Sequence, residues 1–170
     1  MIPGAVGVIN ELQRKRNIKI GSTTGYTSQM MDILKVSAEE QGYKPDCIVT
    51  ADQVPQARPF PYMVWSNAIQ LDINPISAIV KVDDTVDGVL EGVTAGCWSV
   101  GIAKTGNYMG LNEADLLNLE KSDPSMYKKK LDQAYGILSS AGAHYVIDDI
   151  TGLPRVIDDI ERRLAQGEVP

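Results

Sequence analysis

The chain has 170 residues, with 16 Lys and Arg against 22 Asp and Glu, and a net charge of −6. That length suits one domain, and the acidic balance argues against a general nucleic-acid binder. Two cysteines make no disulfide framework, so we expect reduced thiols in a cytoplasmic protein. We expect neither a membrane span nor a signal peptide, because no apolar run approaches roughly 20 residues and no basic start precedes an apolar core.

The first part of the chain predicts a helix, a strand and a second helix. A helical stripe follows Pro3 and ends at the basic run 14–16, which complements a helix dipole. We expect a strand at 17–21 and a turn rich in hydroxyls at 22–27. The apolar side of the next helix is formed by Met30, Met31, Ile33, Leu34 and Val36. Such a turn before a helix can bind phosphate, although an ordinary N-capped helix explains the same residues equally well.

The middle of the chain continues the alternation. We expect a strand at 47–50, a loop from 51 that ends with Arg58, and a helix from about 62 to 71. Two prolines follow Arg58 closely and stiffen the backbone beside this isolated cation. An apolar, β-branched run then predicts a strand at 77–82.

An acid pair, Asp83 and Asp84, follows the 77–82 strand. Adjacent carboxylates repel each other unless a cation lies nearby, so the pair indicates a Mg²⁺ site built from oxygen ligands. A solvated turn with a helix N-cap is the alternative. An EF-hand loop is excluded, because its third position is Thr85 and its twelfth is Thr94.

The last part of the chain predicts two further strands and four further helices. The strands are expected at 97–102 and 143–147, and the helices at 86–93, 113–119, 127–141 and from Thr151 or Pro154 to Leu164. His144, the single histidine, alternates into a strand and is expected to be structural.

Strands that alternate with helices indicate an α/β fold with a parallel, doubly wound sheet. The hydroxyl turn, the Arg58 loop and the acid pair each follow an expected strand. Ligands bind at the carboxyl ends of the strands in such sheets. Hydroxyls, one cation and a metal-binding carboxylate at that edge suit a site that holds a phosphoryl or phosphonyl group during attack on phosphorus.

Five motifs together resemble the phosphonoacetaldehyde hydrolase (phosphonatase) family of the haloacid dehalogenase superfamily. They are GSTTGYT at 21–27, QGYKPD at 41–46, RPFPYM at 58–63, VKVDDT at 80–85 and AGAHY at 141–145. The resemblance implies a Rossmann-like, three-layer parallel sheet, in which residues 1–170 form a single, incomplete core domain. It also implies Mg²⁺-dependent hydrolysis of the carbon–phosphorus bond of phosphonoacetaldehyde, which yields acetaldehyde and phosphate.

The resemblance also assigns roles to residues. Its phosphate-binding set is Ser22, Thr23, Thr24, Gly25, Tyr26 and Arg58, of which Arg58 and Thr24 are the catalytic residues. Arg58 would neutralise the charge of the phosphonyl group, and Thr24 would bind its oxygens. Asp84 would ligate Mg²⁺ directly or through water, with Asp83 supporting it.

Two departures from the family pattern concern catalysis. The family's nucleophilic Asp, on an N-terminal strand, and its Schiff-base Lys, in a helical cap, find no counterpart, and neither Lys81 nor Lys104 is assigned to the latter role. Some members carry an acid where Gly88 stands, and we expect the Asp83–Asp84 pair to substitute for it. The absent strand should lie centrally, so we expect two unpaired strand edges, and hence a rearranged sheet or an association that covers the gap.

Three functions therefore stay open. The first is a phosphonatase core that is inactive alone and becomes active when another segment supplies the nucleophile and cap. The second is a non-catalytic module that binds phosphate and Mg²⁺ or pairs with a partner. The third is another phosphatase of the same superfamily. The expected partners are a small phosphonate and either a second copy of the chain or a complementing N-terminal segment, with neither nucleic acid nor membrane.

Overall fold

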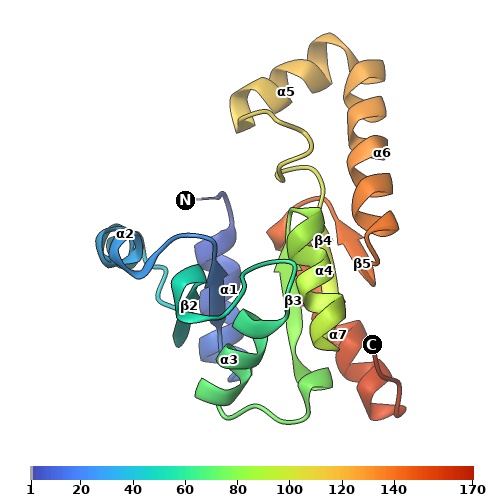
Figure 1. The fold of residues 1–170 in the computed structure, drawn as a ribbon. Helices are drawn as coiled ribbons and strands as arrows, with labels where there is room; N and C mark the ends of the chain where they lie inside the picture. Colours follow the sequence, from blue (N-terminus) through green and yellow to red (C-terminus); the bar gives the residue numbers. More distant parts are fainter. Residues whose placement is uncertain (1) are drawn as a thin grey trace.

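The computed structural model describes residues 2–170 and has the predicted α/β architecture (Figure 1). In chain order the elements are α1 Ala5–Arg16, β1 Gly21–Thr24, α2 Ser28–Glu40, β2 Cys47–Thr50, α3 Tyr62–Gln70, β3 Val80–Asp83, α4 Val86–Ala95, β4 Trp98–Ile102, α5 Glu113–Ser122, α6 Pro124–Ser140, β5 Tyr145–Ile147 and α7 Leu153–Ala165. Short 3-10 turns lie at Ala51–Gln53, Ile76–Ala78 and Ile150–Gly152. No helix within residues 2–170 is long and apolar enough to cross a membrane.

The strands form two separate parallel sheets. In the first, β1 pairs with β2, with Gly21 opposite Cys47. In the second, β4 lies between β3 and β5. Within residues 2–170, β1 and β3 are therefore paired on one side only and do not pair with each other. The two unpaired edges predicted from the sequence are present.

A cavity of about 710 Å³ separates the two sheets. Residues 18–23 of the β1 segment line one side of it, and residues 79–84 of the β3 segment line the other. Side chains from the helices on both faces, including Leu12, Ile157 and Asn67, also line it. We call this space the interstrand cavity. It leads to the carboxyl ends of both strands, where the sequence predicts the functional site.

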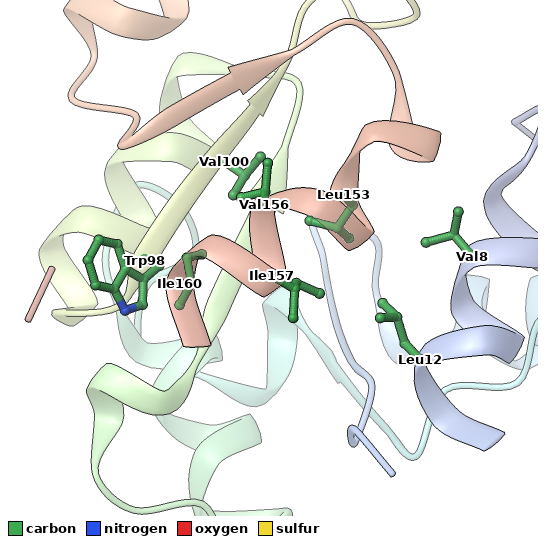
Figure 2. Packing of buried hydrophobic residues seen from close by; sticks show 8 residues of the cluster. All are labelled: Val8, Leu12, Trp98, Val100, Leu153, Val156, Ile157 and Ile160. Carbon is green, nitrogen blue, oxygen red and sulfur yellow. The ribbon is translucent and has the colours of Figure 1, made fainter. Parts of the chain in front are cut away.

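The largest core cluster covers one face of the three-stranded sheet (Figure 2). Its buried members come from α1, β4 and α7, and they are Val8, Leu12, Trp98, Val100, Leu153, Val156, Ile157 and Ile160. Burial of each large aliphatic side chain stabilises the fold by roughly 1.5–3 kcal/mol. Smaller clusters around Val89 and Val64 join α4, α6 and α3 to the opposite face. The helices thus form a layer on each side of the strands.

The strand predicted at 17–21 is displaced along the chain. Strand β1 covers Gly21–Thr24, so hydroxyl residues that were expected in a turn lie in the strand. Before Gly21, the backbone bonds to Asp46: the Ile20 N–H donates to its carboxylate at 2.7 Å, and the Asp46 N–H donates to the Ile20 carbonyl at 2.7 Å. The regular pairing with β2 begins only after this exchange.

Helix α2 is present where it was predicted, and the Thr27 side chain caps it by accepting the Met30 N–H. Its apolar side does not join the core, because no residue of α2 is buried. Ile33 is 76% exposed and Val36 is 55% exposed. The periodicity predicted the helix correctly, but it did not predict where the apolar side would lie.

Candidate functional site

Strand β3 sends alternate side chains to opposite faces of its sheet. Val80 and Val82 pack on the core cluster that contains α7. Lys81 and Asp83 therefore point to the other face, where helix α4 follows the strand. This alternation carries a cation and an anion into the layer between β3 and α4.

Two glycines allow α4 to approach β3 closely. A Cβ atom at Gly88 would lie 1.8 Å from the Asp83 Cγ, and one at Gly92 would lie 2.8 Å from the Lys81 Cβ. The helix begins after Thr85, whose Oγ1 accepts the Gly88 N–H at 3.1 Å. Gly88 thus leaves the space that the Asp83 carboxylate fills, which supports the expectation that the acid pair substitutes for an acid at position 88.

Four charged side chains meet in this layer, and we call them the buried charge cluster: Arg58, Lys81, Asp83 and Glu91. The Lys81 Nζ lies 2.6 Å from the Asp83 Oδ2 and 3.3 Å from the Glu91 Oε2. Arg58 lies farther away, with Nη1 3.6 Å from the Asp83 Oδ2 and Nε 3.6 Å from the Glu91 Oε2. The side chain of Glu91 is fully buried and that of Arg58 is 25% exposed. Two cations therefore balance two anions.

The two carboxyl groups of the cluster differ in acidity. Burial by itself raises the pKa of Asp83, but the Lys81 charge and the hydrogen bonds from Lys81 and Thr85 outweigh burial and leave this pKa below its usual range. For Glu91, burial outweighs the charges of Lys81 and Arg58, so its pKa lies above its usual range. Asp83 is thus held as the anion, and Glu91 is the weaker acid.

Arg58 joins the cluster to β1. Its Nη2 donates to the Thr23 carbonyl at 3.1 Å, and the Thr23 Oγ1 donates to the Glu91 Oε2 at 3.3 Å. The structure therefore brings together Arg58, Thr23 and Asp83, which the sequence predicts for one edge of the sheet, although Thr23 and Asp83 lie within their strands and not after them.

The hydroxyl segment is divided between the cavity and the surface. Ser22 and Thr23 line the interstrand cavity together with Asp83 and Asp84. Thr24, Gly25 and Tyr26 are not among its lining residues. The Thr24 Oγ1 accepts the Tyr26 N–H at 3.2 Å, which forms a local turn. The phosphate-binding roles of these residues stay predictions.

The acid pair separates into one engaged and one more accessible carboxylate. Lys81 and the Thr85 N–H and hydroxyl donate to the Asp83 oxygens, while the Asp84 Oδ2 accepts the Asn107 N–H at 2.9 Å. No group of three or more His, Cys, Asp or Glu side chains that could hold a metal occurs in residues 2–170. The oxygen chemistry suits Mg²⁺, which one or two carboxylates can hold together with water, and the metal-binding roles of Asp84 and Asp83 stay predictions.

The alternative of a solvated turn capped by an acid does not describe Asp83. The N-cap of α4 is Thr85, and the side chain of Asp83 is only 9% exposed. Its carboxylate lies in the interior of the layer between β3 and α4, where it forms an ion pair with Lys81.

The sequence analysis missed Glu91 and left Lys81 without a role. The local signal for Lys81 is a cation inside an apolar, β-branched strand, since such a residue needs a buried partner. The signal for Glu91 is its place between Gly88 and Gly92, the two glycines of a short helix. Neither signal identifies the partner, because that depends on the distance between α4 and β3.

His144 has the structural role that was expected of it. Its Nδ1 accepts the Ser99 N–H at 2.9 Å, and its ring stands edge-on to Trp98 with the ring centres 5.3 Å apart. The contact ties the start of β5 to β4.

Comparison with known proteins places these features in context. No family model matches the sequence. A phosphonoacetaldehyde hydrolase-like protein of Syntrophobacter fumaroxidans is 45% identical over 170 residues, which is 100% of this chain and 60% of that protein. A phosphonoacetaldehyde hydrolase of Hahella chejuensis is 39% identical over 169 residues, which is 99% of this chain and 56% of that protein.

Solved structures show the same similarity. A phosphonoacetaldehyde hydrolase-like protein from Oleispira antarctica superposes with a TM-score of 0.93 at 41% identity, over 99% of this chain and 60% of that one. The chain resembles phosphonoacetaldehyde hydrolases along its whole length. A haloacid dehalogenase-like protein from Agrobacterium tumefaciens, with a TM-score of 0.66 at 19% identity over 94% of this chain and 61% of that one, shares the fold alone. The predicted resemblance and the haloacid dehalogenase-type core are confirmed.

The chain spans about 60% of the length of the curated phosphonoacetaldehyde hydrolases that it matches. This share agrees with the expectation that the family's complete site needs residues beyond those present here.

Proposed function

We propose that this chain is the core of a phosphonoacetaldehyde hydrolase-like enzyme and that it becomes active when a further segment completes its site. The complete enzyme would hydrolyse the carbon–phosphorus bond of phosphonoacetaldehyde to acetaldehyde and phosphate. The proposal rests on the similarity to curated hydrolases over the whole chain. The location of Arg58 beside Thr23 and Asp83 adds support, because a guanidinium there can neutralise a phosphonyl group.

In this proposal Arg58 and Thr24 are the catalytic residues of the chain. Arg58 draws negative charge from the phosphonyl oxygens, and Thr24 binds them together with Ser22, Thr23, Gly25 and Tyr26. Asp84 holds Mg²⁺, and Asp83 supports Asp84 from its ion pair with Lys81. The bound Mg²⁺ would polarise the phosphonyl group, with its remaining ligands coming from outside residues 2–170.

Attack on phosphorus needs a nucleophile, and we assign that role to no residue of this chain. Lys81 is also an unsuitable Schiff-base residue, because its ammonium group is held by Asp83 and Glu91. We propose that a complementing segment enters the interstrand cavity as a strand between β1 and β3. The unpaired edges of these two parallel strands, which line the same cavity, support this route.

A non-catalytic module that binds phosphate and Mg²⁺ or pairs with a partner is the alternative. A role as another superfamily phosphatase and a cytoplasmic location stay predictions.

The test is a turnover assay with phosphonoacetaldehyde and Mg²⁺. The purified chain is assayed alone and after co-expression with the part of the Syntrophobacter fumaroxidans relative that it does not match. We expect acetaldehyde and phosphate only from the combination, and no turnover when the chain carries Arg58→Ala. Glu40→Gln, at an exposed site on α2, is the control and should leave turnover intact.

Turnover by the chain alone would contradict the missing nucleophile. A combination that binds phosphate without turnover would instead support the non-catalytic module.

A further inference from the structure

The carboxylate of Glu91 contacts side chains from three other parts of the fold. Its Oε2 lies 3.3 Å from the Lys81 Nζ on β3 and 3.6 Å from the Arg58 Nε in the loop before α3. The same oxygen accepts a hydrogen bond from the Thr23 Oγ1 on β1 at 3.3 Å. Glu91 thereby connects Thr23 of β1 to Lys81 of β3, two residues that line the interstrand cavity.

The guanidinium of Arg58 faces a partner at each of its three nitrogens. Nε faces Glu91, Nη1 faces Asp83, and Nη2 donates to the Thr23 carbonyl. The Arg58 Nε and the Glu91 Oε1 are both buried without a hydrogen-bond partner. Buried polar atoms are rarely left unsatisfied, so the 3.6 Å approach of the Arg58 Nε to the Glu91 Oε2 is an ion pair that falls short of a hydrogen bond.

Without Glu91, the two cations would share a single anion. Lys81 and Arg58 both lie near the Asp83 Oδ2, so loss of the second carboxylate would leave like charges facing each other in a buried layer. Arg58 is the more exposed of the two, at 25% against 9%, and it is therefore free to turn away.

We propose that Glu91 is a positioning residue that holds Arg58 and Lys81 apart and keeps Arg58 directed at the carboxyl ends of β1 and β3. The proposal rests on the proposed role of Arg58 in binding the phosphonyl group. Glu91 itself is fully buried and touches Arg58 rather than the substrate. If Glu91 acted only as an opposing charge, its removal would tighten phosphate binding. An extra anion near Arg58 weakens the binding of another anion.

Two substitutions separate these effects. Glu91→Gln keeps the shape and removes the charge, whereas Glu91→Asp keeps the charge and withdraws the carboxylate by one methylene. Glu40→Gln, exposed on α2, is the matched control. The affinity of the chain for inorganic phosphate is measured by calorimetric titration. The Arg58 Nε–H resonance, assigned with Arg58→Lys, is followed by ¹⁵N NMR without any ligand.

Both Glu91 variants should weaken phosphate binding by about tenfold or more, because misplacement of a binding group by about 1 Å is costly. Both should also shift the Arg58 Nε–H resonance, and Glu40→Gln should change neither quantity.

Tighter phosphate binding by Glu91→Gln would identify a mere opposing charge and overturn the proposal, as would an unchanged resonance in both variants. If the unsubstituted chain fails to bind phosphate, Arg58 does not bind the anion in the chain alone, while the resonance still decides the role of Glu91. If Glu91→Gln does not fold, Glu91→Asp decides it alone.

Discussion

At the residue scale, Asp83 and Gly88 act as a pair. The Asp83 carboxylate fills the space into which a side chain at position 88 would point. Gly88→Asp alone should destabilise the chain by about 3 kcal/mol, because it adds overpacking and an unpaired buried charge. Asp83→Gly alone should also be destabilising, because Lys81 loses its 2.6 Å partner. The double variant should recover most of the loss, since it returns one carboxylate to the same space. Urea unfolding of each variant measures the coupling.

Gly136→Asp is the control for this exchange. A Cβ at that exposed position on α6 meets nothing within 4 Å, so its stability should change little. If the double variant of Asp83 and Gly88 lost the sum of the two single effects, the two residues would not share one space.

Protonation of His144, the single histidine, makes the stability of the fold depend on pH. Burial and the charge of Arg163 lower the pKa of His144 below its usual range, so the unfolded chain binds its proton more readily. Stability from the Ser99–His144 hydrogen bond is therefore complete above the ordinary histidine pKa and is lost as the pH falls through and below it. His144→Ala should cost about 1 kcal/mol at alkaline pH, and the difference should shrink on acidification. A constant difference in urea unfolding across this range would contradict the protonation of His144.

At the scale of elements, the sequence correctly predicted the helices and strands whose bounds depend on neighbouring residues. Strand β3 and helix α4 were placed to within a few residues, because an apolar run, a capping Thr85 and the glycines of α4 lie in one stretch. Strand β1 was displaced, because its start depends on Asp46, which is distant in sequence. The exposure of Ile33 on α2 was equally unpredictable, since periodicity reports an apolar side and not its partner.

Prediction of the site has the same limit, because contacts between distant parts of the chain cannot be read from the sequence. The sequence placed Arg58, Thr23 and Asp83 near one another, because all three were expected close to the carboxyl ends of parallel strands. It could not pair Lys81 with Glu91, because their contact depends on the close approach of α4 at Gly92. The ion pair between Lys81 and Asp83 was also missed, although alternation along the strand places both side chains on one face.

At the scale of the whole molecule, two half-sheets face one cavity. Helices α1 and α7 share one core cluster, and Arg16 of α1 is paired with Asp158 and Glu161 of α7. The helix layers therefore hold the two strand edges in place although the strands do not pair across the gap. Unpaired parallel edges are templates for a further strand.

This arrangement predicts a specific pattern of hydrogen exchange. Alone, the 18.5 kDa chain should self-associate through its open edges, and amides in β1 and β3 should exchange faster than those in β4, which is paired on both sides. Addition of the unmatched part of the Syntrophobacter fumaroxidans relative should yield an equimolar complex and slow exchange in β1 and β3, while β4 stays unchanged. Light scattering and exchange mass spectrometry measure both effects. A chain that stays monomeric, with exchange in β1 and β3 unaffected by the added segment, would show that the interstrand cavity does not accept a strand.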